Sequence, residues 1–278
     1  MLADDFGAFL RRHLSARRDA SCADRLRLGH HRSMTISNEA DDGVGSYVAW
    51  KGWGEKFGTL SRGDAIYFQR ELREAVRGRA VRRVLEVGYG NGVFLGFARS
   101  QGWSVTGTEL QPELIEVALA AGFDARPAGD LDALADGEYD LIVAFDVFEH
   151  IPPDVSIEFL RGLTRKLRDG GRILLRFPNA DSWIGNPFQN GDVTHVNAIG
   201  GYKMGQYAVE CGLDVVRFRA ETRRGFETSF AHGVYKYTGG VLAKVVGGAL
   251  KALYFPTMPV VMSTSNVVCV LRRSADAA

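Results

Sequence analysis

Short apolar runs alternate with segments of helical periodicity from about residue 81 onward. Runs that are apolar without interruption, such as YDLIVAF at 139–145, are typical of strands buried on both faces of a parallel sheet. Strands are predicted at 84–87, 104–108, 139–145, 172–177, 213–219 and 266–271, and helices at 93–100, 112–121, 153–167 and 203–211. The alternation predicts an α/β fold in which helices cover both faces of one doubly wound sheet.

Two long segments, residues 1–80 and about 220–264, lie outside this alternation. Connections of that length usually form lids or binding walls. The aromatic residues of the first segment (Trp50, Trp53, Phe57, Tyr67 and Phe68) are expected either to cover a bound ligand or to form the core of N-terminal helices. The predicted organisation is an N-terminal helical cap at 1–80, a core at 81–219, an inserted lid or amphipathic helix at 220–264, and a last strand with a tail at 265–278.

One helix of the predicted insertion is apolar on one side. Between Gly240 and Tyr254 its Val, Leu and Ala residues share one side, with Lys244 and Lys251 opposite. We expect this side to pack against the sheet or a second subunit, and the alternative is that it rests on a membrane.

Composition and charge narrow the class of protein. The chain has 278 residues and a net charge of +1, which indicates one large domain without overall attraction for nucleic acid or anionic membranes. Seven arginines lie between residues 11 and 32, and we interpret them as a solvated helix face rather than a phosphate or RNA site. Three cysteines without CxxC spacing and an N-terminus without an apolar stretch predict a cytoplasmic protein, with peripheral membrane contact left open.

The first predicted strand of the core ends in a glycine-rich turn, EVGYGNG, at 86–92. A dinucleotide fingerprint requires G-x-G-x-x-G, but the position of its third glycine is Val93. Glu86 precedes the turn, and a carboxylate there suits a ligand that carries an amine and a sulfonium better than one that carries phosphates.

Two further acids follow in chain order. Glu109 stands at the end of the second predicted strand, where a carboxylate can accept both hydroxyls of a ribose. Gly129 and Asp130 lie in the next loop, where an acid can bind the amino group of adenine. Each acid alone has a structural interpretation, such as a solvated residue or a turn cap, whereas their ordered combination indicates a nucleoside site.

With YDLIVAFDVFEHIP and LRDGGRILLRFPN, these motifs resemble the class I S-adenosylmethionine-dependent methyltransferases over residues 81–219 and the last strand. The resemblance implies a seven-stranded Rossmann-like sheet that closes with an antiparallel pair, and S-adenosylmethionine as the cofactor. It assigns cofactor binding to Glu86, Gly88, Tyr89, Gly90, Glu109, Leu110, Gly129, Asp130 and Phe145.

A narrower resemblance lies in NPFQNGDVTH at 186–195. A Gly-Asp-x-Thr-His segment at this place, followed by a helix and CGLDVV, is similar to methyltransferases of bacterial polysaccharide and O-antigen gene clusters. The next residues, 196–200, depart from the pattern of that group. The resemblance implies a sugar hydroxyl of a polysaccharide precursor or sugar nucleotide as acceptor.

Methyl transfer needs alignment and removal of a hydroxyl proton, so few catalytic groups are required. We predict His195 as the base because its loop follows a strand whose carboxyl end lies at the ligand-binding edge. His150 and Asp146 are predicted to orient that base or the acceptor. The alternative for His195 is a hydrogen bond that only orders its loop.

Asp146, Glu149 and His150 would share one face if this segment were helical, and with His195 they could hold Mg²⁺ or Mn²⁺. A similar arrangement occurs in metal-dependent small-RNA 2′-O-methyltransferases. We do not assign a metal, because metal-free members of the wider family carry a similar Glu-His pair. The alternative functions are therefore RNA ribose methylation with a metal, methylation of a quinone-like small molecule, and non-catalytic cofactor binding.

Overall fold

The computed structural model describes residues 56–275. The arginine-rich segment at 11–32, Trp50, Trp53 and most of the N-terminal cap predicted at 1–80 lie outside the described residues. The described part of that segment contains helix α3 (Arg62–Val76), whose first turn is capped by the Ser61 hydroxyl, which accepts a hydrogen bond from the Asp64 backbone N–H at 3.0 Å.

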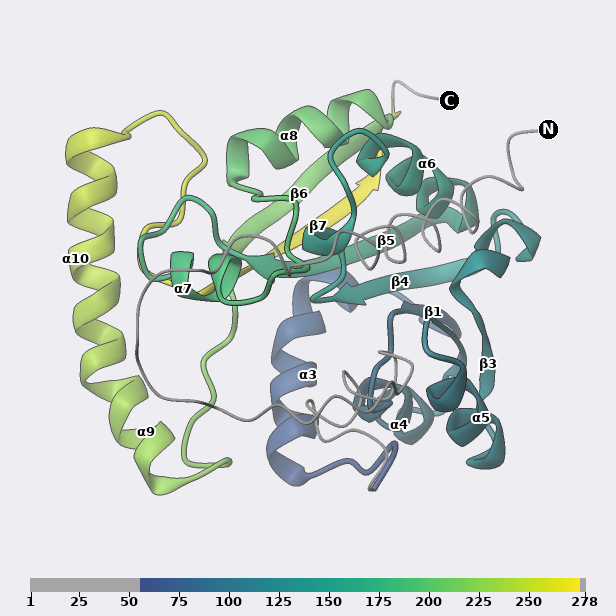
Figure 1. Ribbon diagram of the computed structural model, residues 1–278. Coiled ribbons are helices and arrows are strands. Elements are labelled where there is room, and N and C mark those ends of the chain that lie inside the picture. Colours follow the sequence, from purple (N-terminus) through teal and green to yellow (C-terminus); the bar gives the residue numbers. More distant parts are fainter. Residues whose placement is uncertain (1–55, 276–278) are drawn as a thin grey trace, which may run out of the picture.

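Seven strands form one sheet in the order β3-β2-β1-β4-β5-β7-β6 (Figure 1). All neighbours pair in parallel except β7, which runs antiparallel to both β5 and β6. The predicted Rossmann-like methyltransferase sheet and its antiparallel closing pair are therefore confirmed. The strand bounds are β1 Arg83–Val87, β2 Ser104–Glu109, β3 Asp124–Pro127, β4 Tyr139–Phe145, β5 Leu167–Pro178, β6 Leu213–Ala220 and β7 Asn266–Arg273.

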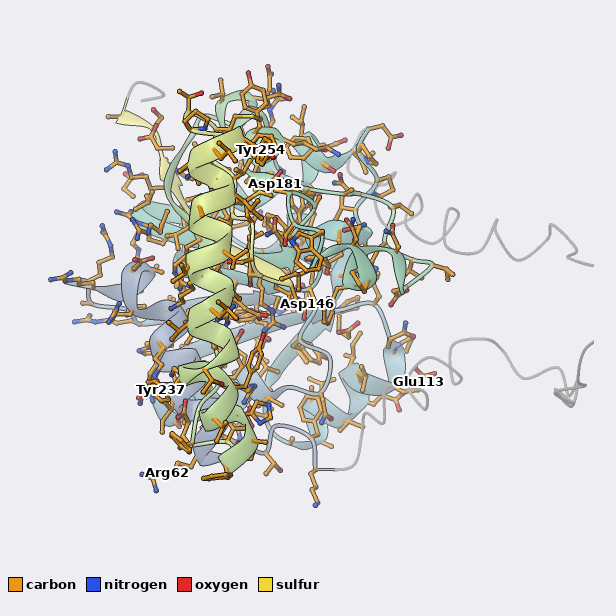
Figure 2. The ribbon with its side chains drawn as sticks, turned by 90° about the vertical axis from the view of Figure 1, so that its left-hand side faces the viewer. Arg62, Glu113, Asp146, Asp181, Tyr237 and Tyr254 are labelled. Atoms are coloured by element: carbon orange, nitrogen blue, oxygen red, sulfur yellow. The ribbon has the colours of Figure 1, made fainter. Side chains whose placement is uncertain are left out.

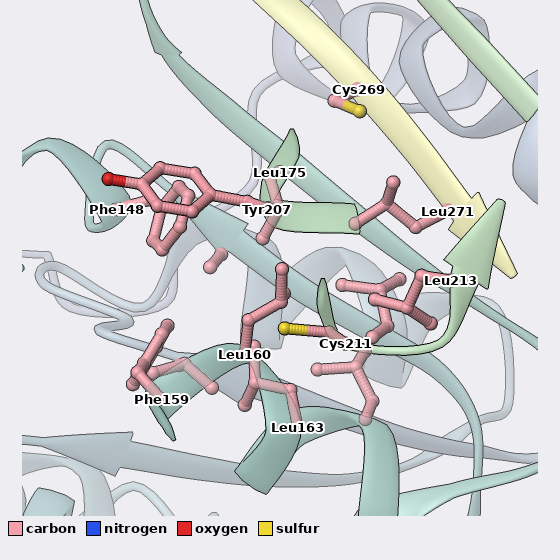
Figure 3. Close-up of a cluster of buried hydrophobic side chains, with 14 of the residues drawn as sticks. Phe148, Phe159, Leu160, Leu163, Leu175, Tyr207, Cys211, Leu213, Cys269 and Leu271 are labelled. Atoms are coloured by element: carbon pink, nitrogen blue, oxygen red, sulfur yellow. The ribbon is translucent and has the colours of Figure 1, made fainter. Parts of the chain in front are cut away.

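The sheet is covered on both faces, so successive residues of a central strand enter different cores. Ile142 and Ala144 of β4 face the core under α6 (Ser156–Lys166) and α8 (Gly201–Glu210), whereas Leu141 and Val143 face the core under α3 and α4 (Val93–Ser100). Figure 3 shows the first of these cores, with Leu160, Tyr207 and Leu271 among its side chains. Burial on both faces explains why these strands are apolar without alternation. Helix α5 (Pro112–Ala120) connects β2 to β3.

Two details of the sheet differ from the sequence prediction. Strand β3 was not located, because only Ala125 of its four residues is buried and its other side chains are polar or proline. Strand β5 begins at Leu167, whereas the sequence predicted a helix to that residue and a strand from Arg172. The Asp169-Gly170-Gly171 segment lies within β5, where the pairing register with β4 shifts.

Between β6 and β7 lie α9 (Phe230–Tyr237) and α10 (Gly239–Tyr254), which stand together at one side of the molecule (Figure 1). The helix predicted at 240–254 is confirmed. The prediction that its apolar side packs on the sheet is wrong, because five of its large apolar residues are exposed: Val241, Leu242, Val245, Val246 and Leu253. Contact with a second subunit or a membrane stays a prediction. Within residues 56–275, no helix has the length and apolar character needed to cross a bilayer.

Candidate active site

A cavity of about 580 Å³ opens at the carboxyl ends of β1, β4 and β5. It lies where the strand order reverses between β1 and β4, which is the place where open α/β sheets bind ligands. Its volume falls within the range of small-molecule sites. We call one part the glycine-turn end (Glu86, Gly88, Tyr89 and Gly90) and another the histidine end (Glu149, His150, Asp192 and His195).

The glycine-turn end depends on backbone conformations that other residues adopt only with strain. Gly88 has φ +69° and Gly90 has φ +50°. A Cβ at Gly88 would also lie 2.6 Å from Cγ2 of Val147, in the segment after β4. Glycine at this position therefore lets the turn approach that segment and leaves its backbone N–H groups close to the cavity.

Glu86 of β1 is 3% exposed and lines the cavity. Its Oε2 has no hydrogen-bond partner among the described residues. Burial, and next the charge of Glu109, raise the pKa of this carboxyl well above its ordinary value. An unpartnered carboxylate oxygen in a cavity wall suits a bound cation, which would restore the charged form.

Glu109 ties the end of β2 to the glycine turn. Its Oε2 accepts a hydrogen bond from the Gly90 N–H at 2.9 Å, and its Oε1 accepts one from the Leu110 N–H at 2.7 Å. Burial raises the pKa of Glu109, while these backbone donors act in the opposite direction. Oε1 also accepts a hydrogen bond from the Gln111 N–H at 3.3 Å, so both of its lone pairs are used. Oε2 keeps one lone pair, so the carboxylate is held in place and can still accept a hydroxyl hydrogen bond.

Of the other residues predicted to bind the cofactor, Phe145 lines the cavity and Leu110, Gly129 and Asp130 do not. Phe145 lines the cavity beside Phe68 and Phe94, with ring centroids 5.5 and 5.4 Å away. Gly129 and Asp130 lie exposed in a short 3₁₀ helix, Ala128–Ala133, and do not line the cavity. Glu109 and Leu110 are also outside its lining, although Glu109 bonds directly to Gly90, which does line it.

These residues fit the cofactor that the sequence resemblance implies. S-adenosylmethionine carries an ammonium, a sulfonium and a ribose. The glycine-turn end offers the unpartnered carboxylate oxygen of Glu86 for a positive charge, and the anchored carboxylate of Glu109 for the ribose, on either side of the glycine backbone. Glu86, Gly88, Gly90 and Glu109 would hold it, and we keep Asp130 as a predicted adenine contact.

His195 lies in the loop after α7 (Asn186–Asn190), and its side chain lines the cavity with 11% exposure. Its Nδ1 is 3.0 Å from the carbonyl oxygen of Phe188. A carbonyl can only accept, so Nδ1 carries the proton and Nε2 of a neutral ring keeps a free lone pair. Nε2 lies 3.9 Å from Glu149 Oε1 and 3.9 Å from Asp192 Oδ2, a suitable arrangement for accepting a proton.

His150 stands next to His195, with ring centroids 4.6 Å apart. The Thr194 hydroxyl donates to Asp192 at 2.6 Å and accepts from His150 Nδ1 at 3.0 Å, which again leaves Nε2 without the proton. Burial, and then the neighbouring His195, lower the pKa of His150 to about 4. His150 is therefore neutral at physiological pH.

Glu149 is 1% exposed, and neither carboxylate oxygen has a hydrogen-bond partner among the described residues. Burial, and next the charge of Asp146, raise its pKa well above the ordinary value. Glu149, His150 and His195 each direct one ligand atom into a space where these atoms lie within 4.8 Å of one another. Two imidazoles and a carboxylate are a donor set that can bind a divalent metal.

Asp146 does not join this group, and the helical arrangement expected for it is wrong. The segment after β4 forms only a 3₁₀ turn over Phe148–His150, and Asp146 precedes it with φ +57°. Its carboxylate forms a two-pronged ion pair with Arg176 of β5, with Oδ1 2.9 Å from Nε. Arg176 also donates to the Tyr67 hydroxyl at 2.7 Å, so Asp146 belongs to the wall beside α3.

Sequence reasoning missed several cavity residues. Arg176 was visible as the one charge within the apolar strand segment ILLRF, a signal that could have identified it. Arg224 pairs with Asp64 of α3 at 2.7 Å, and no local pattern indicated that these residues, 160 positions apart, meet at the cavity. Asp192 was within the quoted Gly-Asp-x-Thr-His motif, but it had no assigned role.

Comparisons with known proteins agree with this geometry. A family described as "Methyltransferase domain" matches residues 62–217. Curated relatives named ubiquinone biosynthesis O-methyltransferase, from Xanthomonas oryzae pv. oryzae strain PXO99A and X. campestris pv. campestris strain B100, are 32% and 30% identical over 101 residues, which is 34% of this chain. The match spans 41% of the length of those relatives.

Among solved structures, a SAM-dependent methyltransferase from Archaeoglobus fulgidus is similar with a TM-score of 0.59 and 19% identity, over 82% of this chain and 99% of that one. The [4+2]-cyclase SpnF is similar with a TM-score of 0.53 and 15% identity, over 83% of this chain and 91% of that one. These structures show the fold alone, because one fold carries different reactions. The family match covers more than half of the sequence and includes the glycine turn, Glu109 and the segment after β4. The chain therefore belongs to the methyltransferase-domain family.

Proposed function

We propose that this enzyme methylates a hydroxyl oxygen of a small acceptor, with His195 as the base. The observation that carries the proposal is the position of His195 Nε2, which has its lone pair free while Nδ1 is held by the Phe188 carbonyl. The side chain lines the same cavity as the glycine turn. A hydroxyl placed between the two ends would meet the methyl donor on one side and a base on the other.

The chain's own residues mainly position the reactants and move one proton. S-adenosylmethionine, when bound, supplies a methyl carbon activated by its sulfonium. Glu86 would bind the cofactor through its positive charge, and Glu109 would orient the cofactor by accepting a hydrogen bond from the ribose. His195 Nε2 accepts the proton of the acceptor hydroxyl as the oxygen becomes nucleophilic.

The surroundings of His195 favour this proton transfer. The imidazolium that forms lies 3.9 Å from an oxygen of Glu149 and 3.9 Å from one of Asp192. A positive charge there stabilises the ionised form of Glu149 and so opposes burial and the charge of Asp146, which raise the pKa of this carboxyl. His150, with its pKa of about 4, stays neutral and adds no repelling charge.

For the acceptor we propose a sugar hydroxyl of a polysaccharide precursor or sugar nucleotide. The wall beside the histidine end contains two ion pairs, Asp146 with Arg176 and Asp64 with Arg224, and Tyr67 between them. Paired charges offer donors and acceptors to several hydroxyls without a net local charge, which suits the sugar ring of such an acceptor.

A second candidate is a phenolic hydroxyl of a quinone-like molecule. The names of the curated relatives favour it, and the aromatic rings of Phe188 and Tyr67 in the cavity wall could contact a flat ring. The same base would serve this acceptor. RNA ribose methylation would require a metal at Glu149, His150 and His195, and a non-catalytic cofactor-binding subunit would transfer nothing.

Label transfer separates these functions. Purified protein would be incubated with S-adenosylmethionine labelled in its methyl group and with nucleotide sugars, glycan extracts, catechol-type quinone precursors or RNA, each with and without EDTA. The proposal expects label in a sugar fraction with EDTA present. Label only in the quinone precursor would select the second candidate. EDTA-sensitive label in RNA would replace both, and the absence of transfer to any acceptor would contradict catalysis.

A further inference from the structure

Helix α10 turns its large apolar residues away from the protein. With 100° between successive residues, Val241, Leu242, Val245, Val246 and Leu253 fall on one continuous side, and each is between 45% and 72% exposed. The opposite side carries the small residues Gly240 and Gly247, which are buried. A helix that packs on its own domain normally shows the reverse arrangement.

The buried glycines explain how the helix is attached. A Cβ at Gly247 would lie 2.4 Å from the Ser263 hydroxyl oxygen, and Arg223 donates a hydrogen bond to the Gly240 carbonyl. Small residues thus bring the helix backbone close to the segment before β7. The large exposed Val and Leu side chains of α10 lie on the outer side of the helix, where no described residue covers them.

Charge and aromatic residues around this side point to one kind of partner. From Thr228 to Ala275 the chain has no aspartate or glutamate, whereas Lys236, Lys244 and Lys251 lie on α9 and α10. Tyr237 and Tyr254 stand near the two ends of α10, each 65% exposed (Figure 2). On α10, Lys244 and Lys251 lie about 60° and 80° beyond Val241, on one flank of the stripe rather than directly opposite it. A basic flank beside an apolar stripe, with exposed tyrosines near the ends of the helix, is typical of helices that lie in a membrane interface.

We propose that α10 docks, through the stripe Val241, Leu242, Val245, Val246 and Leu253, onto the surface of an anionic phospholipid bilayer. A second copy of this chain is a poorer partner, because residues 228–275 contain lysines and no carboxylate, so a contact between two copies of α10 would contain no ion pair. An anionic surface pairs with the same lysines. The helix is about 24 Å long and would lie parallel to the bilayer.

This docking would place the active-site cavity near the membrane surface. Arg223 holds α10 through Gly240, and the next residue, Arg224, lines the cavity. The inference does not depend on the identity of the acceptor, because the stripe is outside the cavity lining.

Vesicle flotation tests the proposal with the full chain. The vesicles contain either phosphatidylcholine alone or phosphatidylcholine mixed with phosphatidylglycerol. We expect the protein to float with the mixed vesicles, and the triple variant Leu242→Gln, Val245→Gln, Leu253→Gln to bind them at least about tenfold more weakly. The matched control is Leu119→Gln with Val209→Gln on α5 and α8, where exposed apolar residues lie outside the stripe, and it should bind like the wild type.

Two further measurements test the contribution of the lysines and the alternative that a second copy of this chain covers the stripe. Lys244→Gln with Lys251→Gln should weaken binding to the mixed vesicles several fold, and added salt should reduce the wild-type binding in the same way. Circular dichroism verifies that every variant is folded. Wild-type protein that stays unbound, or a triple variant that floats equally well, would overturn the proposal. So would a dimer in sedimentation that the triple variant dissociates while no vesicle binding occurs.

Discussion

The glycine-turn end of the cavity is built from backbone, whereas the histidine end is built from side chains that hold one another. At the first, Gly90 donates its N–H to Glu109, and the turn follows directly from β1. At the second, His195 is fixed by Phe188 and His150 by Thr194, in a loop far along the chain from β4. The first end is therefore set mainly by the backbone conformation of the turn after β1, whereas the second depends on the meeting of two segments, as His150 and Thr194, 44 positions apart, show.

The largest effect is expected at the histidine end. His195→Ala should lower kcat by about 10² to 10⁴-fold because the proton acceptor is lost, and should leave the Kd of S-adenosylmethionine within a few fold. Methyl-transfer kinetics and calorimetry measure the two quantities. The control His232→Ala changes an exposed histidine of α9 and should leave both unchanged. A His195 variant with normal kcat would remove the base assignment.

At the glycine-turn end the expected effect is on binding. Glu109→Ala should weaken the binding of S-adenosylmethionine by about 10- to 100-fold, since the carboxylate holds the Gly90 N–H and is the residue that we propose for the ribose. Calorimetric titration measures it. The matched change Glu113→Ala removes an exposed carboxylate in the first turn of α5 and should have little effect. Equal affinities of the two variants would contradict the ribose assignment.

Glu86→Gln should act in opposite directions on stability and on binding. The folded-state pKa of Glu86 is raised, so the free protein loses stability as pH rises from the unfolded value, about 4.3, through the folded one. Removing the charge should therefore raise the melting temperature of the free protein at pH 7. It should also weaken S-adenosylmethionine binding by about tenfold, because the cation loses its partner. Thermal melts with and without the cofactor measure both, and a lowered melting temperature of the free variant would contradict the assigned environment.

The smallest effect is a pH dependence at the histidine end. His150 has a folded pKa of about 4, below the unfolded value near 6.5, so the unfolded chain binds more protons between these values. The stability that neutral His150 provides is present above pH 6.5 and is lost as pH falls toward 4. Relative to pH 7, His150→Gln should remove about 1 kcal/mol of this loss at pH 5.5. Urea unfolding at the two pH values measures it, and identical pH slopes for variant and wild type would refute the prediction.

The same difference between the two ends explains what could be predicted from sequence. The apolar runs predicted six strands, and the glycine turn and Glu109 were identifiable because their function depends on short motifs at strand ends. Strand β3 was missed because it is short and mostly exposed. The meeting of His150 and His195 followed from the shared sheet edge, but the atoms that hold each ring could not be derived.

Asp146 and α10 show the limits most clearly. The left-handed backbone conformation of Asp146 directs its side chain toward Arg176. Hydrophobic periodicity contains no information about such a conformation. Periodicity predicted the two sides of α10, but not that small residues would take the inner one. Both outcomes are decided by tertiary contacts rather than by local preference.

The position of β7 determines when the sheet can be completed during synthesis. This strand is made after every other strand of the sheet, yet it lies between β5 and β6. A nascent chain that has reached only Ser265 therefore has no β7 between these strands, which leaves the edge of β5 available for unintended pairing. Slow translation or early termination near the end of this chain would for that reason promote aggregation rather than a slightly shortened enzyme.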